Sequence, residues 1–369
     1  MRFLLVCTSL AGGGAERVAV NLAKSFVALG HSVTLFQRNR TQDYYHLDSR
    51  VARIYPRYPG VIGQVVSLSH VIDDFSPDAL ISFTDASNVI SYLASRLSRR
   101  TVAYIPTVHT DVKARDERIG LSIKFKIIRV FHRFACKRAY RVVAVSKGAK
   151  AALINYYGVA EHKVNTIWNP VLEKDFVILG RNNVKHNPST VRLVAVGRLT
   201  EAKNYFLMLD VVKELNFRGG SNYSLDIYGY GELEEKLKAY TVENGLEDVV
   251  SFNGFVENIQ LVINEYDAFV LTSSWEGFGN VLVEALCASL PVVARDCPSG
   301  PREILSEGKF GHLVSSDDVV DFCLAIESAV RQSMDFTIDD VRDHLNNFRV
   351  DVVAERYIGL VSNDHKIKA

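Results

Sequence analysis

Short, continuous apolar runs alternate with amphipathic stretches in the first half of the chain. Such runs, rich in Val, Ile, Leu and Phe, are typical of strands buried on both faces of a parallel sheet. The stretches between most of them have the helical period and can cover those faces, so the alternation predicts an α/β fold with a doubly wound parallel sheet. We expect strands at residues 3–7, 33–36, 79–83, 102–105, 142–145 and 164–167.

A second series of strands begins at residue 191. Its members are expected at 191–196, 224–228, 249–256, 267–271, 291–294 and 311–314, before closing helices at about 318–331, 338–346 and 351–361. The stretch between the two series is polar and Asn-rich and contains Pro170 and Pro188, which predicts a linker that acts as a hinge. A length of 369 residues suits two domains of ordinary size. We therefore expect an N-terminal domain at 1–172, a linker at 173–190, a second domain at 191–346 and a tail at 347–369.

The composition describes a globular protein with an ample core. Hydrophobic residues make up 48% of the chain and charged residues 23%, which excludes a disordered protein. No apolar run reaches the roughly 18 residues of a membrane span, and the first residues form a strand rather than a signal peptide. The expected location is the cytosol. The five cysteines are scattered without a C-x-x-C pair, so neither a disulfide framework nor a zinc cluster is expected.

Charge is distributed unevenly between the two halves. Residues 1–180 contain 25 Lys and Arg against 13 Asp and Glu, a net +12, whereas residues 181–369 contain 18 against 29, a net −11. This asymmetry supports two domains with different surfaces, of which the first meets an anionic partner.

The apolar run 267–271 leads into a stretch, residues 274–284, that combines glycines with two glutamates. Gly277 and Gly279 free the backbone at a strand-to-helix turn, beside which the amides of a helix N-terminus are presented. Glu276 stands at the mouth of the turn, and Glu284 follows eight residues later, about two turns along the same helix face. Amides suit phosphate and carboxylates suit sugar hydroxyls, which predicts a nucleotide-sugar site. The structural alternative is an ordinary glycine turn before a helix.

Two cations follow the first strand of the second series. Arg198 and Lys203 flank its carboxyl end, where they can clamp a pyrophosphate, Arg as a fork and Lys as a point charge. The alternative is a pair of surface cations. A further glycine-rich exit at Gly229 follows the strand 224–228, and another loop follows the strand 249–256.

The first strand of the chain exits into Gly12, Gly13 and Gly14. This run fails the G-x-G-x-x-G spacing, and no acidic residue closes the second strand at Gln37, which argues against a nicotinamide-dependent oxidoreductase. The glycines still permit close approach of a ligand, or else make a tight turn. His109 follows the strand 102–105, and it therefore lies at the sheet edge where open α/β sheets bind ligands. A structural or merely exposed histidine is the alternative.

The most basic stretch is residues 112–141, with ten Lys and Arg against two acids. Apolar residues recur in it at helical spacing, at Ile119, Ile123, Ile127, Phe131 and Phe134. A basic amphipathic helix of this kind can lie in a membrane interface. It can equally pack on the core with a solvated face of Lys and Arg. Nucleic acid is not expected, because no binding motif accompanies the charge.

Taken in order, these motifs resemble the GT-B-fold retaining glycosyltransferases of glycosyltransferase family four. The matching pieces are residues 12–17, His109, residues 197–204, Gly229 with Gly231, and the two-glutamate element 276–284. The resemblance implies two Rossmann-like domains that face across a cleft, with the C-terminal helices crossing back to the first domain. It also implies that the second domain holds most of the nucleotide.

Residue roles follow from the same resemblance. Arg198 and Lys203 would bind the diphosphate, and Glu284 would accept hydrogen bonds from the ribose. Glu276 would hold the donor sugar together with the amides of Gly277, Phe278 and Gly279. The further donor-binding residues implied are Gly13, Gly14, Gly229, Val256 (near the base) and Asn280. His109 would approach the transferred sugar, so that His109, Glu276, Arg198 and Lys203 are the expected catalytic group, and Glu16 and Arg17 would face the acceptor beside His109.

The chemistry is consistent with these roles. Fixed cations and amides stabilise a departing diphosphate, so no metal and no cofactor beyond the UDP-sugar is expected. In retaining members the acceptor hydroxyl attacks from the face of the leaving group, and Glu276 is therefore not assigned as a covalent nucleophile. The loop 297–303 resembles that of bacterial members that use UDP-N-acetylhexosamines or UDP-hexoses to build surface glycans such as O-antigen, lipopolysaccharide or capsule.

The expected partners are a UDP-sugar, a lipid-linked saccharide acceptor and, through residues 112–141, the anionic inner-membrane surface. These expectations place the protein in the cytoplasm, peripheral at the inner membrane. A catalytically silent module that binds sugar nucleotides or lipid surfaces is the alternative.

Overall fold

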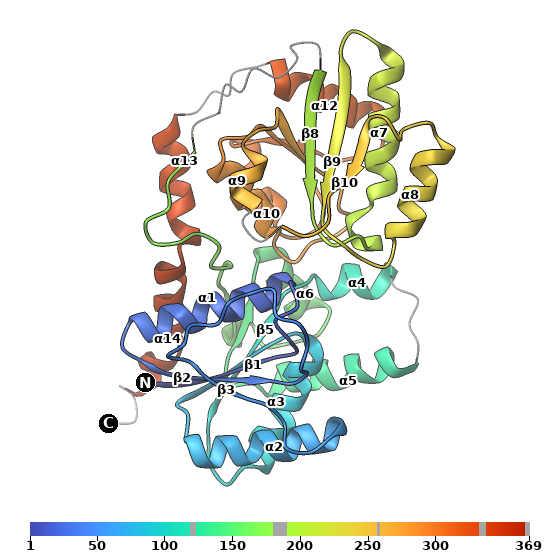
Figure 1. Cartoon of the computed structure of the whole chain (residues 1–369). Coiled ribbons are helices and arrows are strands. Elements are labelled where there is room, and N and C mark those ends of the chain that lie inside the picture. Colours follow the sequence, from blue (N-terminus) through green and yellow to red (C-terminus); the bar gives the residue numbers. More distant parts are fainter. Residues whose placement is uncertain (119–122, 180–189, 257–258, 332–336, 366–369) are drawn as a thin grey trace. The chain divides into compact units, whose positions relative to one another are not determined.

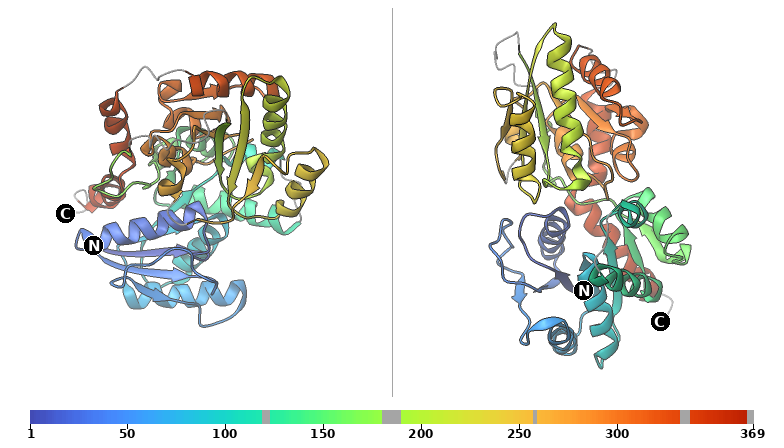
Figure 2. Two further views of the ribbon diagram at one scale, coloured as in Figure 1. Left: turned by 45° about the horizontal axis from the view of Figure 1, so that its top comes forward. Right: turned by 90° about the vertical axis from the view of Figure 1, so that its right-hand side faces the viewer.

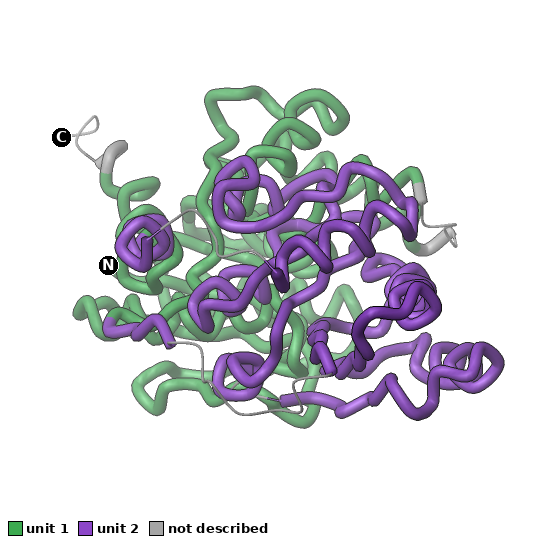
Figure 3. The backbone as a smooth tube through the Cα atoms, turned by 90° about the horizontal axis from the view of Figure 1, so that it is seen from above, with its two compact units in different colours: residues 1–174, 347–369 green, residues 175–346 purple. Residues whose placement is uncertain are grey.

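The computed structural model describes residues 1–118, 123–179, 190–256, 259–331 and 337–365. The chain divides into two compact units, which Figure 3 distinguishes by colour. Unit 1 comprises residues 1–174 and 347–369, and unit 2 comprises residues 175–346. Residues 180–189 of the predicted linker and Ile119 of the basic stretch lie outside the described residues.

Unit 1 is built on a parallel sheet. Its described strands number seven and have the order β3-β2-β1-β4-β5-β6-β7. They are β1 (Arg2–Cys7), β2 (Ser32–Gln37), β3 (Ala52–Ile54), β4 (Ala79–Phe83), β5 (Ala103–Val108), β6 (Val142–Ala144) and β7 (Val164–Thr166). The helices are α1 (Gly14–Ala28), α2 (Gly60–Phe75), α3 (Asp85–Leu97), α4 (Val112–Arg118), α5 (Ile123–Arg138), α6 (Lys147–Asn155) and α14 (Val350–His365), as Figure 1 shows. The sequence pattern misses β3, because this edge strand is short and incompletely buried.

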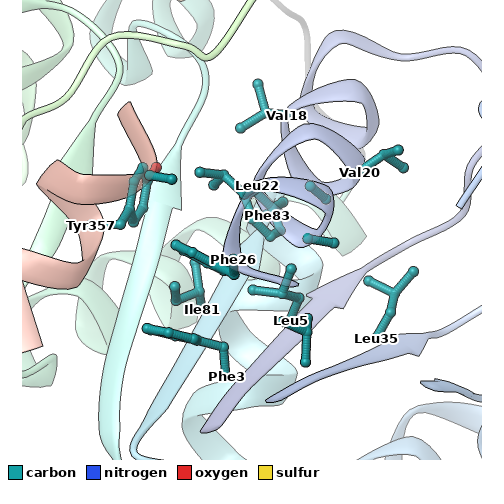
Figure 4. Close-up of a cluster of buried hydrophobic side chains, with 14 of the residues drawn as sticks. Phe3, Leu5, Val18, Val20, Leu22, Phe26, Leu35, Ile81, Phe83 and Tyr357 are labelled. Atoms are coloured by element: carbon teal, nitrogen blue, oxygen red, sulfur yellow. The ribbon is translucent and has the colours of Figure 1, made fainter. Parts of the chain in front are cut away.

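Alternation along β1 divides the core of unit 1 into two layers. Phe3 and Leu5 point to one face, where they pack with α1 and with Tyr357 of α14 (Figure 4). Leu4 and Val6 point to the other face, and their cluster includes residues of α2, α3, α5 and α6 (Figures 1 and 2). Each of these large side chains is fully buried and contributes about 1.5–3 kcal/mol by leaving water. The doubly wound architecture follows from strands that are apolar on both sides.

The end of the chain completes unit 1. The Val171 and Leu172 amides donate to the Phe348 carbonyl over 2.9 and 3.1 Å, and the Val350 amide donates to Leu172 over 2.8 Å. These bonds place α14 against α1, where Tyr357 is 1% exposed. The return of the last helix to the first domain, which the resemblance implies, is present.

Unit 2 repeats the parallel plan with another strand order. Its described strands form a six-stranded sheet in the order β10-β9-β8-β11-β12-β13. They are β8 (Thr190–Val196), β9 (Asn222–Tyr228), β10 (Val250–Phe252), β11 (Ala268–Leu271), β12 (Val292–Arg295) and β13 (His312–Val314). The helices are α7 (Tyr205–Arg218), α8 (Glu234–Glu243), α9 (Ile259–Ile263), α10 (Asn280–Cys287), α11 (Pro301–Ile304), α12 (Val319–Arg331) and α13 (Ile338–Leu345). Helices α7, α8 and α12 share one hydrophobic cluster with strands of the sheet, and α10 packs on β12.

Candidate active site

The predicted donor residues of unit 2 gather where the strand order reverses. From β8 the sheet grows through β9 to β10 on one side and through β11 to β13 on the other. In open α/β sheets this switch point opens a crevice at the carboxyl ends of the strands, and ligands bind there. The loops that flank it are residues 197–204 after β8 and residues 272–279 after β11.

Hydrogen bonds hold these two loops together. The Ser274 amide donates to the Ala202 carbonyl over 2.8 Å. The Thr272 hydroxyl lies 3.1 and 3.0 Å from the carbonyls of Lys203 and Asn204. Backbone and hydroxyl contacts across the switch point therefore fix both loops before any ligand arrives.

Lys203 and Glu276 meet in this crevice. The Lys203 Nζ atom lies 2.5 Å from Glu276 Oε1, and the Ser273 hydroxyl donates to the same oxygen over 2.7 Å. The side chains are only 18% and 10% exposed, so the ion pair is largely shielded from water. The structure thus brings together two residues predicted from separate motifs, and it adds Ser273, which the sequence reasoning missed. Ser273 is the second residue after β11, and this place at the carboxyl end of a strand is the sequence feature that could have identified it.

Glycines let the neighbouring loops approach closely. A Cβ on Gly229 would collide with the Gly197 carbonyl, and the Gly229 amide donates to Gly254 over 2.7 Å. The loop that carries the predicted base-binding Val256 is therefore joined to the Gly229 turn. Gly300 has a φ of 97°, and a Cβ there would overlap the Phe278 carbonyl, so the loop after β12 also closes on the glycine turn.

Helix α10 begins later than the sequence reasoning assumed. Its first residue is Asn280, and Gly279 precedes it with a φ of 98°. Glu276 therefore lies outside the helix, and the prediction that it shares a helix face with Glu284 is wrong. Glu284 lies in the second turn of α10, and it is only 1% exposed. The turn at Gly277 and Phe278 leads into the amide end of α10, whereas Arg198 is an exposed side chain on the loop after β8.

The predicted acceptor residues belong to unit 1, whose switch point lies between β1 and β4. Hydroxyl groups meet there: Thr8 lies 3.1 Å from Thr84 and 3.3 Å from Ser87. Thr84 has a φ of 84°, which is unusual for a β-branched residue and marks a strained turn. Arg38, directly after β2, donates to Thr8 and Ser87 over 3.4 Å. No motif in the sequence pointed to Thr8, Arg38, Thr84 or Ser87.

The first glycine loop starts α1. Gly13 precedes the helix, and the Glu16 carboxylate folds back so closely that a Cβ on Gly13 would overlap it. Gly14 is exposed, and Arg17 lies in the first turn with its amide bonded to the Gly13 carbonyl over 3.1 Å. The close approach at Gly13 is therefore to the protein's own glutamate.

His109 is the first residue after β5, at the same edge of the sheet. Its Nε2 atom lies 2.8 Å from the Thr107 hydroxyl, which itself donates to the Ser82 carbonyl over 2.9 Å. Because the Thr107 proton is used on Ser82, the imidazole must donate from Nε2, and Nδ1 keeps a lone pair. That Nδ1 is buried and makes no hydrogen bond within the described chain. Burial lowers the pKa of His109 to about 4, so the ring is a neutral acceptor at neutral pH.

The basic segment forms α4 and α5, and its outer side is apolar as well as basic. Val130 and Phe131 are 68% and 49% exposed, and Ile127 and Phe134 are exposed as well. The described members of the predicted stripe are therefore exposed, whereas Ala135 and Cys136 on the inner side of α5 are buried in the core. The helix packs on the core, as the structural alternative expected, but its outer face carries apolar side chains among the cations. The side chain of Ile123 lies outside the described part of the chain.

Polar residues are also buried on the inner side of α5. His132 is fully buried, 3.4 Å from Asp85 and 3.0 Å from the Asn88 amide nitrogen. Arg129 pairs with Asp116 over 3.0 Å. The sequence pattern cannot show these buried polar contacts, because the partners are contributed by α3 and α4.

Within the described residues, no group of three or more His, Cys, Asp and Glu side chains is arranged to hold a metal ion. No described helix is long and apolar enough to cross a membrane.

Comparisons with known proteins agree with this geometry. Residues 12–172 match the family model "Glycosyltransferase Family 4", and residues 180–346 match "Glycosyl transferases group 1". A lipopolysaccharide 1,6-galactosyltransferase of Escherichia coli K12 is 35% identical over 184 residues, which are 49% of this chain and 49% of that protein. That match therefore spans about half the length of the relative.

A second relative aligns over a longer stretch. The N-acetylgalactosamine-N,N'-diacetylbacillosaminyl-diphospho-undecaprenol 4-alpha-N-acetylgalactosaminyltransferase of Campylobacter jejuni serotype O:2 is 25% identical over 322 residues, 84% of this chain and 85% of that protein. The crystal structure of Anabaena HepE with UDP and glucose superposes with a TM-score of 0.73 at 19% identity, covering 99% of this chain and 98% of that one. Both halves of the sequence, the two doubly wound units and the structural similarity point to one conclusion: the chain belongs to the GT-B-fold glycosyltransferases of the family-four type.

Proposed function

We propose that this protein is a retaining glycosyltransferase that transfers an N-acetylhexosamine or a hexose from a UDP-sugar to a lipid-linked or oligosaccharide acceptor. The observation that carries the proposal is the Lys203–Glu276 pair, 2.5 Å apart at the switch point of unit 2 and joined to a glycine turn and a helix N-terminus. A cation, a carboxylate and the backbone amides of a helix N-terminus in one crevice suit a sugar diphosphate better than any of them alone.

Each donor residue has a distinct role in this proposal. Lys203 and the exposed Arg198 stabilise the diphosphate as it departs, and the amides after Gly277 add to that stabilisation. Glu276 binds hydroxyls of the donor sugar, Glu284 binds the ribose, and the base lies near Val256. Because these fixed positive charges stabilise the departing diphosphate, we propose that the reaction needs no metal.

Glu276 acts as a binding group and not as a covalent nucleophile. Its Oε1 atom already accepts from both Lys203 and Ser273, which lowers its nucleophilicity. The acceptor hydroxyl would attack from the side of the leaving group, and the departing phosphate would take its proton. The Nδ1 lone pair of His109 would accept a hydrogen bond from a hydroxyl of the transferred sugar.

The names of the relatives support a role in bacterial surface polysaccharide synthesis. One refers to lipopolysaccharide and another to a diphospho-undecaprenol-linked saccharide, while the Anabaena structure contains UDP and glucose. A UDP-sugar donor and a lipid-linked acceptor are accordingly our proposal for this chain.

Release of UDP tests the transfer reaction. The protein should release UDP from UDP-GalNAc, UDP-GlcNAc, UDP-glucose or UDP-galactose when a lipid-diphosphate-linked saccharide or a lipopolysaccharide core oligosaccharide is supplied, and NMR should show retained anomeric configuration. Lys203→Ala and Glu276→Ala should each lower kcat/KM at least a hundredfold. Lys213→Ala, an exposed lysine of α7 in the same unit, is the matched control. Tight UDP binding without turnover across the panel would favour the catalytically silent alternative.

We also propose that the outer face of α5 attaches the protein to the cytoplasmic side of the inner membrane. Exposed Phe125, Ile127, Val130, Phe131 and Phe134 stand among Lys126, Arg133, Lys137 and Arg138, and this described face contains no acidic residue. Apolar side chains that enter the headgroup region and cations that attract anionic lipid form the usual interfacial combination.

Vesicle sedimentation measures this attachment. Val130→Ser with Phe131→Ser, and separately Lys126→Glu with Lys137→Glu, should each reduce binding to phosphatidylglycerol vesicles, and high salt should weaken the wild type. Lys236→Glu on α8 provides a charge change away from this face. Unaltered sedimentation in both double variants would refute the attachment. Arg129 is unsuitable for such a test, because its ion pair with Asp116 is structural.

A further inference from the structure

A cavity with three arginines in its lining lies in unit 1. Its volume is about 310 Å³, and its lining comes from the segment after β2 and from the connection between β3 and α2. The lining residues are Arg38, Arg40, Tyr55, Pro56, Arg57, Tyr58, Pro59 and Gln64. Three arginines and no acidic residue line this pocket, so its potential is strongly positive.

Arg38 is held in place by neutral oxygens. Its Nε atom donates to the Gln64 side chain over 2.9 Å, and Nη1 reaches the hydroxyls of Thr8 and Ser87 over 3.4 Å. These groups orient the guanidinium without neutralising it. Burial lowers the pKa of Arg38. This direction is expected for a cation that loses contact with water and has no carboxylate beside it.

Neighbouring arginines show that carboxylates are available on the same segment. Arg50 pairs with Asp48 over 2.7 Å, and Arg53 pairs with Asp43 over 2.5 Å. In contrast, no ion pair within the described chain involves Arg38, Arg40 or Arg57. Within the segment 38–57, the arginines without an ion pair are therefore the three that line the pocket.

The rest of the lining suits a sugar or a phosphate ester. The Arg40 guanidinium stacks over the Tyr55 ring at 4.4 Å from its centroid, which keeps it rigid and leaves its N–H edge available. Tyr58 is 48% exposed and offers a ring face. Pro59 precedes α2, whose first turn has no side-chain cap, so the amide end of a 16-residue helix borders the pocket.

We propose that this pocket binds a phosphate group carried by the acceptor, with Arg38, Arg40 and Arg57 as its ligands and Tyr58 against the adjoining sugar or lipid. The inference rests on the proposed function, because it assumes that unit 1 receives the acceptor. It goes beyond that function by assigning residues that recognise a phosphate of the acceptor and by placing this recognition outside the reacting centre.

Strand order sets the spacing between this pocket and His109. Arg38 follows β2 and His109 follows β5, and β1 and β4 lie between them. Three strand spacings amount to about 14 Å, which exceeds the length of one sugar ring. The phosphate would therefore sit on a different part of the acceptor from the hydroxyl that reacts.

Isothermal titration of the full chain with glucose 6-phosphate, inorganic phosphate and glucose tests this assignment. Glucose 6-phosphate should bind and glucose should not. Arg40→Gln with Arg57→Gln, both exposed positions, should weaken glucose 6-phosphate binding at least tenfold, and Arg38→Gln should do the same. The matched control is Arg99→Gln with Arg100→Gln, two exposed arginines just before β5 at the opposite edge of unit 1, which should change binding less than twofold.

Phosphatidylglycerol vesicles provide the second arm. If vesicles, and not glucose 6-phosphate, lose affinity in the Arg40/Arg57 variant, the phosphate belongs to a lipid headgroup. The proposal would be overturned by equal losses in the two double variants, or by an Arg40/Arg57 variant that binds both glucose 6-phosphate and vesicles as tightly as the wild type. Glucose bound as tightly as glucose 6-phosphate would overturn it too. UDP should raise the melting temperature of every variant equally. If UDP does not raise the melting temperature of the wild type, the proposed function is refuted. The glucose 6-phosphate titrations would then still decide whether the pocket binds phosphate.

Discussion

The Lys203–Glu276 ion pair offers a quantitative test of how unit 2 is held before the donor binds. At 2.5 Å and an effective dielectric constant of about 20, the gross attraction is about 7 kcal/mol. Desolvation of both ions offsets most of it, so the intact pair contributes little net stability. Removing one partner is different, because the other charge remains shielded and unpaired.

Lys203→Met should therefore destabilise unit 2 by about 3 kcal/mol, at the low end of the usual range for a broken buried pair. The low end applies because the two side chains keep 18% and 10% exposure and because Ser273 still donates to the carboxylate. Glu276→Gln should cost about 1–2 kcal/mol, since the amide oxygen still accepts from Lys203. The double variant should lose no more than Lys203→Met alone, which corresponds to a coupling energy of at least about 1–2 kcal/mol.

Tryptophan fluorescence can report unit 2 selectively. The chain has two tryptophans, and Trp275 adjoins Glu276 while Trp168 belongs to unit 1. In a Trp168→Phe background, urea and thermal unfolding followed by Trp275 should show Lys203→Met melting roughly 6–12 °C lower. A double variant whose loss equals the sum of the single losses would refute the coupling, and so would a Lys203→Met protein as stable as its parent.

The remaining predictions concern pH, a glycine and a helix cap. Folding stability should fall as pH drops from about 6.5 toward 4, because burial depresses the pKa of His109 and of His132 and the unfolded chain then binds more protons; His109→Asn should reduce this slope in acid titrations. The acid limb of kcat/KM for sugar transfer should have an apparent pKa near 4, and a limb near 6.5 that disappears in His109→Asn would contradict the neutral imidazole. Gly300→Ala should cost more than 2 kcal/mol in urea unfolding because its Cβ meets the Phe278 carbonyl, whereas Gly245→Ala, with φ of 65° and open space, should cost only about 1 kcal/mol; equal costs would rule out the steric explanation. Thr337→Ala removes a capping box from α13 and should lower stability by about 1 kcal/mol, which a Thr337→Ser control should largely restore.

Local patterns in the sequence were sufficient for most of the strands and helices, although not for the short edge strand β3. The strand predicted at 79–83 coincides with β4, and the helices expected at 318–331 and 338–346 correspond closely to α12 and α13. These features depend on neighbouring residues, since side-chain period, glycine and proline act over a few positions. Lys203, Glu276 and His109 became candidate site residues because each lies in a segment that follows a predicted strand and matches a motif of the family.

Tertiary structure decided everything that joins distant segments. The 73-residue separation between Lys203 and Glu276 is closed only by the order in which β8 and β11 pair. The buried polar contacts of α5 depend on partners from α3 and α4, and the state of His109 depends on Thr107 and Ser82. Arg38 becomes an unpaired cation only because β1, α2 and α3 surround it with neutral oxygens. Periodicity determines which elements form, whereas strand order and burial determine which charges meet, and the latter are properties of the folded chain alone.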